Sequence, residues 1–409
     1  MAEQHEKTLV PQIRFAGFTD PWEQRKLGEL TESYSGGTPA AGESEFYGGS
    51  IPFIRSAEIA AESTELFLTE KGYESSSARM VKPGDVLYAL YGATSGEVAV
   101  SRQKGAINQA ILAILPRDDC DARYITAWLR KQKGYIVTTY LQGGQGNLSG
   151  MIVKNLEVSI PSLPEQQKIG SMLSHLDSLI TLHQRKYDKL CVLKKSMLDK
   201  MFPKGGSLYP EIRFAGFTDP WEQRKLGDVA RRVTRKNENR DSDLPLTISA
   251  QYGLVDQRTF FNNQVASKDM SGYFLLHKGE FAYNKSTSTD SPWGAIKRLE
   301  KYDMGCVSTL YICFELLSGD PDFLVTYYET DRWYKAVQLI AAEGARNHGL
   351  LNIAPDDFFE TQICIPKRID EQRQIGAFFD RLDSLITLHQ RKLELLRNIK
   401  KSMLDKMFV

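Results

Sequence analysis

The stretch that decides the fold of this chain is LPEQQKIGSMLSHLDSLITLHQRKYDKLCVLKKSMLDKMF, from Leu163 to Phe202, and it occurs twice. The second copy runs from Ile369 to Phe408, and within it LDSLITLHQRK and KKSMLDKMF are identical to the first copy. A further exact repeat, IRFAGFTDPWEQRKLG, occupies residues 13–28 and 212–227. We call these two copies the frame segments. The chain is therefore two half-molecules in which repeated segments surround different variable segments.

Apolar residues recur at spacings of four and three along both copies of the long repeat. A seam with this period, kept over four to five heptads, is typical of a coiled coil. Some 39 residues at about 1.5 Å each make a helix of roughly 58 Å. Pairing within one chain is the simplest arrangement. An antiparallel pair would place the two domains at opposite ends of the rod and a parallel pair would place them side by side; we expect the antiparallel pair.

The seam positions of the first helix are Ile169, Leu173, Leu176, Ile180, His183, Tyr187 and Leu190, continuing to Lys194, Met197 and Met201. Those of the second helix are Ile375, Phe379, Leu382, Ile386, His389, Leu393 and Leu396, continuing to Lys400, Met403 and Met407. His183 and His389 occupy equivalent positions. We interpret them as polar residues that fix the register rather than as metal ligands, because no acidic or cysteine partner lies at ligand spacing.

Composition sets the outer bounds. With 409 residues, 42% apolar and 25% charged, the chain is expected to be a soluble globular protein of two or three domains. It has no run of about 18 apolar residues and no secretory signal, so we expect a cytoplasmic protein. The five scattered cysteines predict reduced thiols rather than disulfides or zinc. A net charge of +1 argues against a protein that coats nucleic acid, although residues 183–204 and 231–240 form local basic clusters.

The variable segments, residues 29–160 and 228–366, mix short strand-like runs with helical ones. They share parts in the same order: VKPGDVLY (Val81–Tyr88) corresponds to LHKGEFAY (Leu276–Tyr283), and the loop QGNLSG corresponds to GARNHG. Both end in Ile-Pro followed by an acidic EQ pair that opens the long helix. The sequence thus predicts an α+β protein with two similar mixed domains. The predicted boundaries are 1–160, 161–204 for the first helix, 205–366, and 367–409 for the second helix.

Catalytic patterns are missing from the sequence. No Asp or Glu has a Lys two positions later, as a restriction-type nuclease needs, and neither HExxH nor GxSxG occurs. The glycine-rich loop at residues 141–150 lacks the GK[ST] ending of a phosphate-binding loop. Asp20-Pro21-Trp22 lacks the second proline of the loop with which amino-methyltransferases hold a target amine. The sequence therefore predicts a non-catalytic chain.

Duplicated domains on a rigid rod suit the reading of two separated marks on a linear polymer. DNA offers such marks, because half-sites on one face recur about every 34 Å. A membrane or filament ruler would fit the rod equally well but would not explain why the variable segments differ. Different variable segments predict different ligands for the two halves.

The order of these parts resembles the specificity subunit of type I restriction-modification systems. The resemblance rests on the frame segments, on EQ-x-x-IG and LDSLI in both helices, on SGGTP and IPFIRSAEI in the first domain, and on YNKSTSTDSPWGAIKRL in the second. It implies two target-recognition domains, each reading one half of an asymmetric bipartite sequence in the major groove of double-stranded DNA. The helices would act as spacer and as docking surface for two modification (methyltransferase) subunits, to which restriction (ATP-dependent translocase and nuclease) subunits add.

The resemblance also implies that this chain holds no cofactor or metal. S-adenosylmethionine, ATP and Mg would belong to the partner subunits, as would adenine methylation and DNA cleavage. Two alternatives stay open: a stand-alone DNA-binding or scaffolding protein with no methyltransferase partner, and an uncharacterised enzyme that acts alone.

Base edges are read by Arg, Lys, Asn, Gln, Ser and Thr on exposed loops, and phosphates by Lys, Arg and backbone amides. The DNA-contacting candidates of the first domain are Arg55, Ser56, Tyr88, Tyr91, Thr94, Ser95, Gln142, Gln145 and Asn147. Those of the second domain are Ser249, Gln251, Tyr252, Asn284, Lys285, Ser286, Thr287, Arg346, Asn347 and His348.

Overall fold

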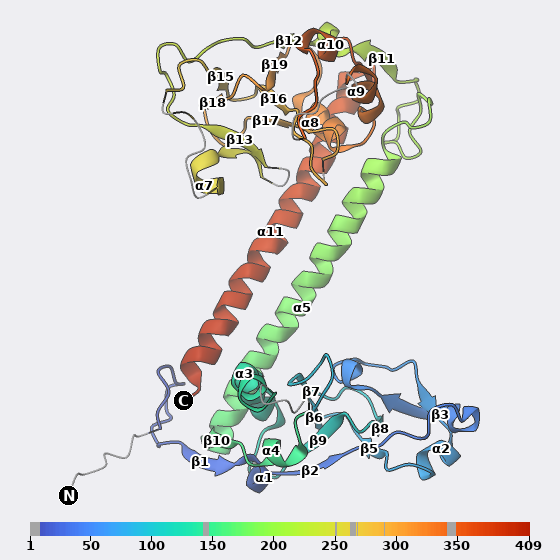
Figure 1. Ribbon diagram of the computed structural model, residues 1–409, viewed down its shortest axis with the longest axis vertical. Helices are drawn as coiled ribbons and strands as arrows, with labels where there is room; N and C mark the ends of the chain where they lie inside the picture. The colour runs from blue at the N-terminus through green and yellow to red at the C-terminus, as the bar shows by residue number, and fades with distance from the viewer. Residues whose placement is uncertain are drawn as a thin grey trace, which may run out of the picture. The chain divides into compact units, whose positions relative to one another are not determined.

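The computed structural model describes residues 9–141, 147–249, 252–261, 267, 269–289, 291–341 and 349–409. The chain divides into two compact units (Figure 1). The first unit consists of Met1–Arg185 and Gln390–Val409, and the second of Lys186–His389. Each unit thus combines one variable segment with parts of both long helices. Within the described part of the chain, none of the helices has the length and apolar character needed to cross a membrane.

Two β-sheets form the body of the first unit, with strand orders β2-β9-β6-β7 and β4-β3-β8-β5, and β1 pairs separately with β10. The strands are β1 (Glu23–Lys26), β2 (Thr31–Ser35), β3 (Tyr47–Ile54), β4 (Phe67–Leu68), β5 (Arg79–Val81), β6 (Val86–Ala89), β7 (Val98–Val100), β8 (Gly105–Ile107), β9 (Ile111–Pro116) and β10 (Glu157–Ile160). The helices are α1 (Leu27–Leu30), α2 (Glu70–Glu74), α3 (Ala122–Leu141) and α4 (Gly150–Lys154), with 3-10 turns η1 (Ser44–Phe46) and η2 (Ser56–Glu58).

The central strand β6 is apolar at every position because both of its faces are covered. Val86 and Tyr88 point into the core shared with α3 and the long helices. Leu87 and Ala89 point into a second core, which contains Ile54 of the other sheet. Successive side chains of a strand face opposite sides, so a strand buried on both faces is a continuous apolar run.

The second unit repeats this plan. Its four-stranded sheet has the order β12-β19-β16-β17, and β11 pairs with β20, β13 with β14 and β15 with β18. The strands are β11 (Glu222–Lys225), β12 (Ala230–Arg232), β13 (Leu246–Ser249), β14 (Gly253–Asp256), β15 (Phe274–His277), β16 (Phe281–Asn284), β17 (Ala295–Arg298), β18 (Met304–Val307), β19 (Ile312–Leu316) and β20 (Gln362–Ile365). The helices are α6 (Leu226–Val229), α7 (Gln257–Phe261), α8 (Pro321–Glu329), α9 (Tyr334–Ile340) and α10 (Pro355–Phe359). The prediction of two similar mixed domains is confirmed.

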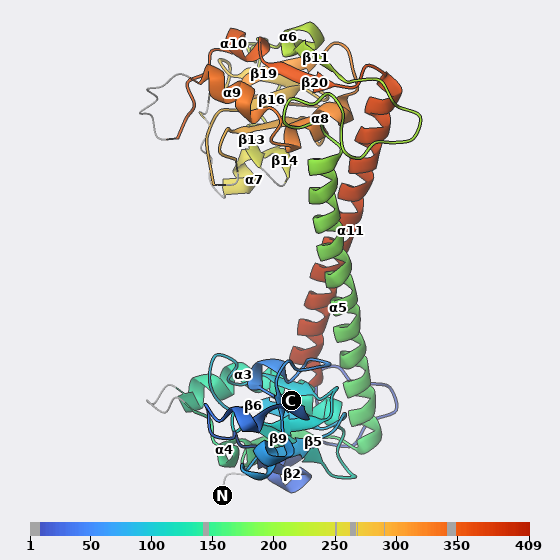
Figure 2. The ribbon, with the colours of Figure 1, turned by 90° about the vertical axis from the view of Figure 1, so that its right-hand side faces the viewer.

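The long helices are α5 (Leu163–Lys200) and α11 (Ile369–Met407). In the first unit, the start of α5, with Ile169 and Leu173, shares a core with Met407 from the end of α11. In the second unit, Met201, just beyond the end of α5, shares a core with Ile375 and Phe379 from the start of α11. Figure 2 shows the start of α11 beside the end of α5 in the second unit. The two helices therefore pair in antiparallel orientation in each unit, as expected.

Every predicted seam position is buried or half-buried. The units do not follow the sequence boundaries, however. Phe408 at the end of α11 lies 5.3 Å from Tyr124 of the first unit, centroid to centroid. The ring centroid of Phe202, after α5, lies 5.8 Å from that of Trp221 in the second unit. Each domain core is thus completed by the helix that follows the other domain.

Candidate nucleic-acid interface

The loop after β6 meets the glycine-rich loop before α4 in the first unit. Tyr91 forms an isolated antiparallel bridge with Asn147. The backbone N–H of Leu148 donates to the carbonyl of Leu90 at 2.9 Å. We call residues 90–97 and 147–149 the first loop pair. The sequence placed candidate residues on both loops, and the structure brings the described ones together.

The equivalent loops meet in the second unit. Ser286, after β16, forms an isolated bridge with Leu350. The backbone N–H and the hydroxyl of Thr287 both donate to the carbonyl of Gly349, at 2.7 and 2.9 Å. Leu351 donates to the carbonyl of Lys285 at 3.0 Å. We call residues 285–289 and 349–351 the second loop pair; it lies at the same place in the fold as the first.

The first loop pair presents polar groups with different freedom to bind. Asn147 is exposed, and Tyr91, Thr94 and Ser95 are half-buried. The Ser95 hydroxyl donates to the Gly92 carbonyl at 3.0 Å. The Thr94 hydroxyl is buried and finds no hydrogen-bond partner among the residues that the structure describes. Asn147 is therefore the candidate of this pair best placed to reach a base edge.

The second loop pair uses some of its candidates to hold its own backbone. The Asn284 side chain accepts from the Ser286 N–H at 3.0 Å, which is a local turn that Asn forms readily. The Lys285 ammonium donates to the Ile353 carbonyl at 3.3 Å, and burial lowers the pKa of Lys285. Ser286 is exposed, so among the candidates of the second loop pair it has the most access to a ligand.

Two candidates are corrected by their burial. Tyr88 is 0% exposed and lies within β6, and burial raises the pKa of its phenol to about 12. Ser249 is 6% exposed, and its hydroxyl accepts from the Tyr252 N–H at 3.2 Å. Because neither side chain reaches the surface, the prediction that they contact DNA is wrong.

The remaining described candidates lie away from β6 and β16 in the fold. Arg55 and Ser56 follow β3 in the other sheet, and the Arg55 guanidinium donates to Glu58 at 2.6 Å. This arginine holds the pKa of Glu58 below its ordinary value. Tyr252 is 52% exposed, with the Lys301 ammonium 5.6 Å from its ring centroid. Six further candidates lie outside the described residues: Gln142, Gln145, Gln251, Arg346, Asn347 and His348.

The comparisons with known proteins agree with this architecture. Residues 19–191 match the family described as the type I restriction modification DNA specificity domain. The chain is 26% identical to the type I restriction enzyme MjaIX specificity subunit of Methanocaldococcus jannaschii over 61% of this chain, and 25% identical to the EcoR124I/EcoR124II specificity subunit of Escherichia coli over 41%. Residues 19–191 therefore form a type I specificity domain.

The match to individual relatives is partial. The aligned parts span 62% and 46% of the two specificity subunits, less than two thirds of their length. The fold extends further. The crystal structure of a type I restriction-modification S subunit from M. genitalium covers 98% of this chain and is itself covered to 99%, with a TM-score of 0.58 at 14% identity. At 14% identity, this structural similarity is evidence for the fold alone.

The frame segments have a structural role that sequence reasoning missed. Arg14 forms a bidentate ion pair with Glu165 at 2.7 and 2.8 Å. The backbone N–H of Ile13 donates to the Lys406 carbonyl at 3.0 Å. The second frame segment makes the same contacts through Arg213, Glu371, Ile212 and Lys200. Each frame segment thus joins the start of one long helix to the end of the other. The sequence contained a signal for this contact, because the arginine of the frame segment and the Glu-Gln pair at the start of the long helix both occur in each half of the chain.

The basic cluster at residues 231–240 is mostly engaged within the protein. Its ion pairs are Arg231–Glu315 at 2.5 Å, Arg232–Asp356 at 3.7 Å, Arg235–Glu280 at 2.7 Å and Arg240–Asp269 at 3.8 Å. Lys236 lies over the ring of Phe274, 4.0 Å from its centroid. These contacts offset much of the positive charge that the sequence displays here.

The seam histidines are half-buried. The described residues contain no group of three His, Cys, Asp or Glu side chains arranged to hold a metal ion. The seam lysines, by contrast, have defined acidic partners: Lys194 contacts Asp383, and Lys400 contacts Asp177. The aspartates come from the two identical LDSLI segments, so the same pairing recurs in both units.

Proposed function

We propose that this chain is the DNA-reading subunit of a type I restriction-modification complex, in which each domain reads one half of an asymmetric bipartite target. The observation that carries the proposal is that each unit has a loop pair. The two loop pairs occupy the same place in two equal scaffolds, yet one joins Tyr91 to Asn147 and the other joins Ser286 to Leu350. A constant scaffold with different exposed loops is the arrangement expected of two readers with different targets.

The chemistry of the loop pairs supports base reading more than general DNA attraction. Asn side chains form paired hydrogen bonds with adenine, and hydroxyls contact several bases. Glycine-rich turns leave backbone N–H groups for phosphates. The net charge of only +1 keeps sequence-independent attraction low. The affinity for DNA would therefore depend on contacts at the loop pairs.

The two long helices would set the spacer between the half-sites and dock two methyltransferase subunits, to which restriction subunits add. S-adenosylmethionine, ATP and Mg would act in those partners, and this chain would hold no catalytic residue. The antiparallel pairing within each unit supports a helix pair of defined register. Removing one heptad from both helices, about 10 Å, should shift the preferred spacing by about three base pairs or abolish activity. An unchanged spacing would show that the helices are not the ruler.

Base reading is tested by replacing Asn147 with alanine in the complete complex and measuring methylation of a library of targets. We expect one half of the target to relax by about 1–3 kcal/mol while the other half stays strict. Replacing Arg346 should relax the other half. Asn155→Ala is the matched control, since Asn155 is an exposed asparagine of the same unit outside the loop pair. A uniform loss on all DNA after Asn147→Ala would contradict the base-reading role.

Purification of a tagged chain from its host distinguishes the proposal from a stand-alone DNA-binding or scaffolding protein. The specificity subunit should bring down a methyltransferase, in two copies for each tagged chain. Methylation by the isolated chain would contradict a non-catalytic role. Mapping methylated adenines in the host genome would then give the target and its spacer.

A further inference from the structure

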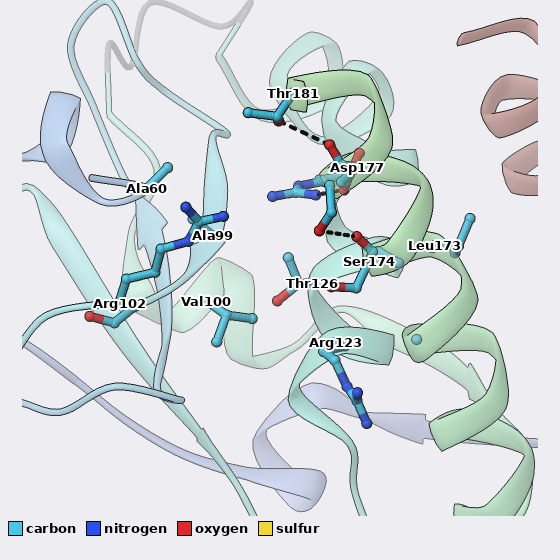
Figure 3. A pocket seen from close by; sticks show the side chains of 15 residues that line it. Ala60, Ala99, Val100, Arg102, Arg123, Thr126, Leu173, Ser174, Asp177 and Thr181 are labelled. Atoms are coloured by element: carbon cyan, nitrogen blue, oxygen red, sulfur yellow. Dashed lines mark hydrogen bonds and ion pairs between the residues drawn. The ribbon is translucent and has the colours of Figure 1, made fainter. Parts of the chain in front are cut away.

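The first unit contains a pocket of about 290 Å³ between β7, α3 and the start of α5. Figure 3 shows Arg102 on one side of it and Asp177 on the other, with Arg123 at its lower edge. Arg130 of α3 lines the same pocket. Its walls are therefore rich in arginine, and none of its described lining residues belongs to the first loop pair, residues 90–97 and 147–149.

In the second unit, ion pairs fill the equivalent space between β17 and α8. Arg298 of β17 donates to Glu300 at 2.8 Å and to Asp322 of α8 at 2.6 Å. Lys297 lies 3.5 Å from Glu329, at the end of α8. Strand and helix are thus joined by opposite charges, and the basic side chains occupy the space between them.

The correspondence between the units follows from their hydrogen bonds. Val100 pairs with Val86 of β6, as Arg298 pairs with Phe281 of β16. The helices start alike as well: the N–H of Asp121 donates to the Gln166 side chain, and that of Asp320 to Gln372, both at 2.9 Å. Arg123 and Arg130 are therefore the counterparts of Asp322 and Glu329, and Arg102 is the counterpart of Glu300.

The charges of the side chains around this space between strand and helix are inverted in the first unit relative to the second. Three acids of the second unit, Glu300, Asp322 and Glu329, are replaced by Arg102, Arg123 and Arg130. The two basic side chains that fill the space, Lys297 and Arg298, are replaced by Ala99 and Val100. The inversion removes the internal ion pairs and leaves arginines around an open pocket.

The acids that remain nearby do not occupy all the donors of these arginines. The pairs are Arg102–Glu62 at 3.1 Å, Arg123–Asp121 at 3.2 Å and Arg130–Asp177 at 2.6 Å, and Arg130 Nε also donates to the Val98 carbonyl of β7 at 3.2 Å. Each guanidinium has five N–H groups, and each of these arginine side chains is at least 37% exposed. The pocket can thus still donate to an anion.

Several arginines around one pocket suit a group with more than one negative charge. A phosphate monoester carries about −1.5 to −2 charges at pH 7 and three acceptor oxygens, and arginine binds phosphate with paired hydrogen bonds. The described residues that line the pocket include no aromatic ring, so it offers no surface for stacking a base. The phosphate group itself, rather than a nucleobase, is the chemistry that the pocket fits.

We propose that the pocket between β7, α3 and α5 of the first unit is a phosphate-binding site in which Arg102 and Arg130 donate to the ligand from opposite walls. The phosphate would add a second connection between strand and helix, beside the hydrogen bond from Arg130 to the Val98 carbonyl, where the second unit uses Arg298 and Asp322. The phosphate can come from the solution, free or on a small molecule, or from a DNA backbone. The proposal does not depend on base reading by the loop pairs.

The test titrates the full chain with inorganic phosphate by calorimetry, at constant ionic strength and without DNA. We expect saturable binding that weakens by about tenfold or more in Arg102→Gln, which removes charge-assisted hydrogen bonds. Arg25→Gln is the matched control, since Arg25 is also a partly exposed arginine with one acidic partner, Asp119 at 2.9 Å, and should bind as the native chain does. A triple variant, Val100→Arg with Arg102→Glu and Arg123→Asp, rebuilds the closure of the second unit and should abolish phosphate binding.

A second arm identifies the source of the phosphate by measuring affinity for duplex DNA against salt. If a DNA phosphate occupies the site, Arg102→Gln lowers the salt slope by about one, whether or not free phosphate binds. Free phosphate binding with unchanged DNA affinity assigns the site to a dissolved ligand. The proposal is overturned if Arg102→Gln changes neither phosphate binding nor the salt slope, or if Arg25→Gln changes them equally.

Discussion

Lys194 and Lys400 stand at the same position of two identical KKSMLDKMF segments, yet we expect their replacement by methionine to have different effects. The Lys194 ammonium lies 2.7 Å from Glu329 and 2.6 Å from Asp383. Lys400 contacts Asp177, which Arg130 already binds at 2.6 Å. Lys194→Met therefore removes the main partner of two acids, whereas Lys400→Met leaves its acid paired.

The magnitude follows from what each substitution leaves unpaired. Removing one partner of a buried ion pair costs about 3–5 kcal/mol. The Glu329 side chain is 21% exposed and keeps Lys297 at 3.5 Å, so about 2–3 kcal/mol is the reasonable figure for Lys194→Met. For Lys400→Met, with Arg130 still on Asp177, we expect about 0–1 kcal/mol.

Acid should reduce the difference between the native chain and Lys194→Met. Although burial opposes ionisation of Glu329, Lys194 and Lys297 hold its pKa below the ordinary value. A carboxyl with a lowered pKa contributes stability above its unfolded pKa, near 4.5, and this contribution is lost as the pH falls further. Burial instead raises the pKa of Asp383 despite Lys194, so Glu329 carries most of the effect.

Hydrogen exchange of the full chain measures each unit separately. Lys194→Met should increase exchange in α8 and the start of α11, while Lys400→Met should leave α3 and the end of α11 nearly unchanged. Lys195→Met and Lys401→Met are matched controls, because both neighbouring lysines are exposed. Equal losses of protection from Lys194→Met and Lys400→Met, or no loss in the second unit, would refute the reasoning.

Three further predictions concern buried groups. Phe408→Ala should destabilise the first unit by about 3–5 kcal/mol, seen as an early thermal transition, because this ring is 4% exposed; an unchanged melting curve would contradict its role in that core. Tyr88→Phe should leave DNA affinity unchanged and raise stability at pH 7 by up to about 1–3 kcal/mol, since its buried hydroxyl has no hydrogen-bond partner among the described residues. Its pKa is raised to about 12, so the native chain should lose stability above pH 10, where the unfolded phenol ionises, and the variant should lose less in alkaline denaturation. Arg213→Met should cost the second unit about 3–5 kcal/mol in urea denaturation, because Glu371 is 1% exposed and, among the described residues, its carboxylate would keep only the hydrogen bond from the Trp221 indole N–H at 3.2 Å; full stability would show that this ion pair is dispensable.

The two long helices and their buried faces were predictable because the evidence for them is local and repeated. The seam spacing fixes which face of each helix is buried, and burial at Leu173 and Leu382 follows it. The equal domain plan was predictable for a related reason. VKPGDVLY and LHKGEFAY place the same turn before the same central strand, and β6 and β16 begin two residues after the glycine in both units.

The site was predictable only as pairs of loops. Tyr88 and Tyr91 stand three residues apart in one apolar run, YALY, but β6 ends at Ala89 between them. Tyr88 therefore points into the core, and Tyr91 lies in the loop that meets Asn147. A sequence shows the run but not the residue at which pairing with β7 and β9 stops, and that residue decides which side chains can reach a ligand.

The repeated sequence by itself determined that the chain has two like halves, a heptad seam and two different loop sets, because periodicity and identity are properties of neighbouring residues. Only the tertiary structure decided what identical residues do in the two halves. Lys194 meets Glu329 and Lys400 shares Asp177 with Arg130, and one place between strand and helix is closed by Arg298 in one unit and open between arginines in the other. The physical reason is that charge acts through space, so the function of the repeated residues depends on distant parts of the chain that are not repeated.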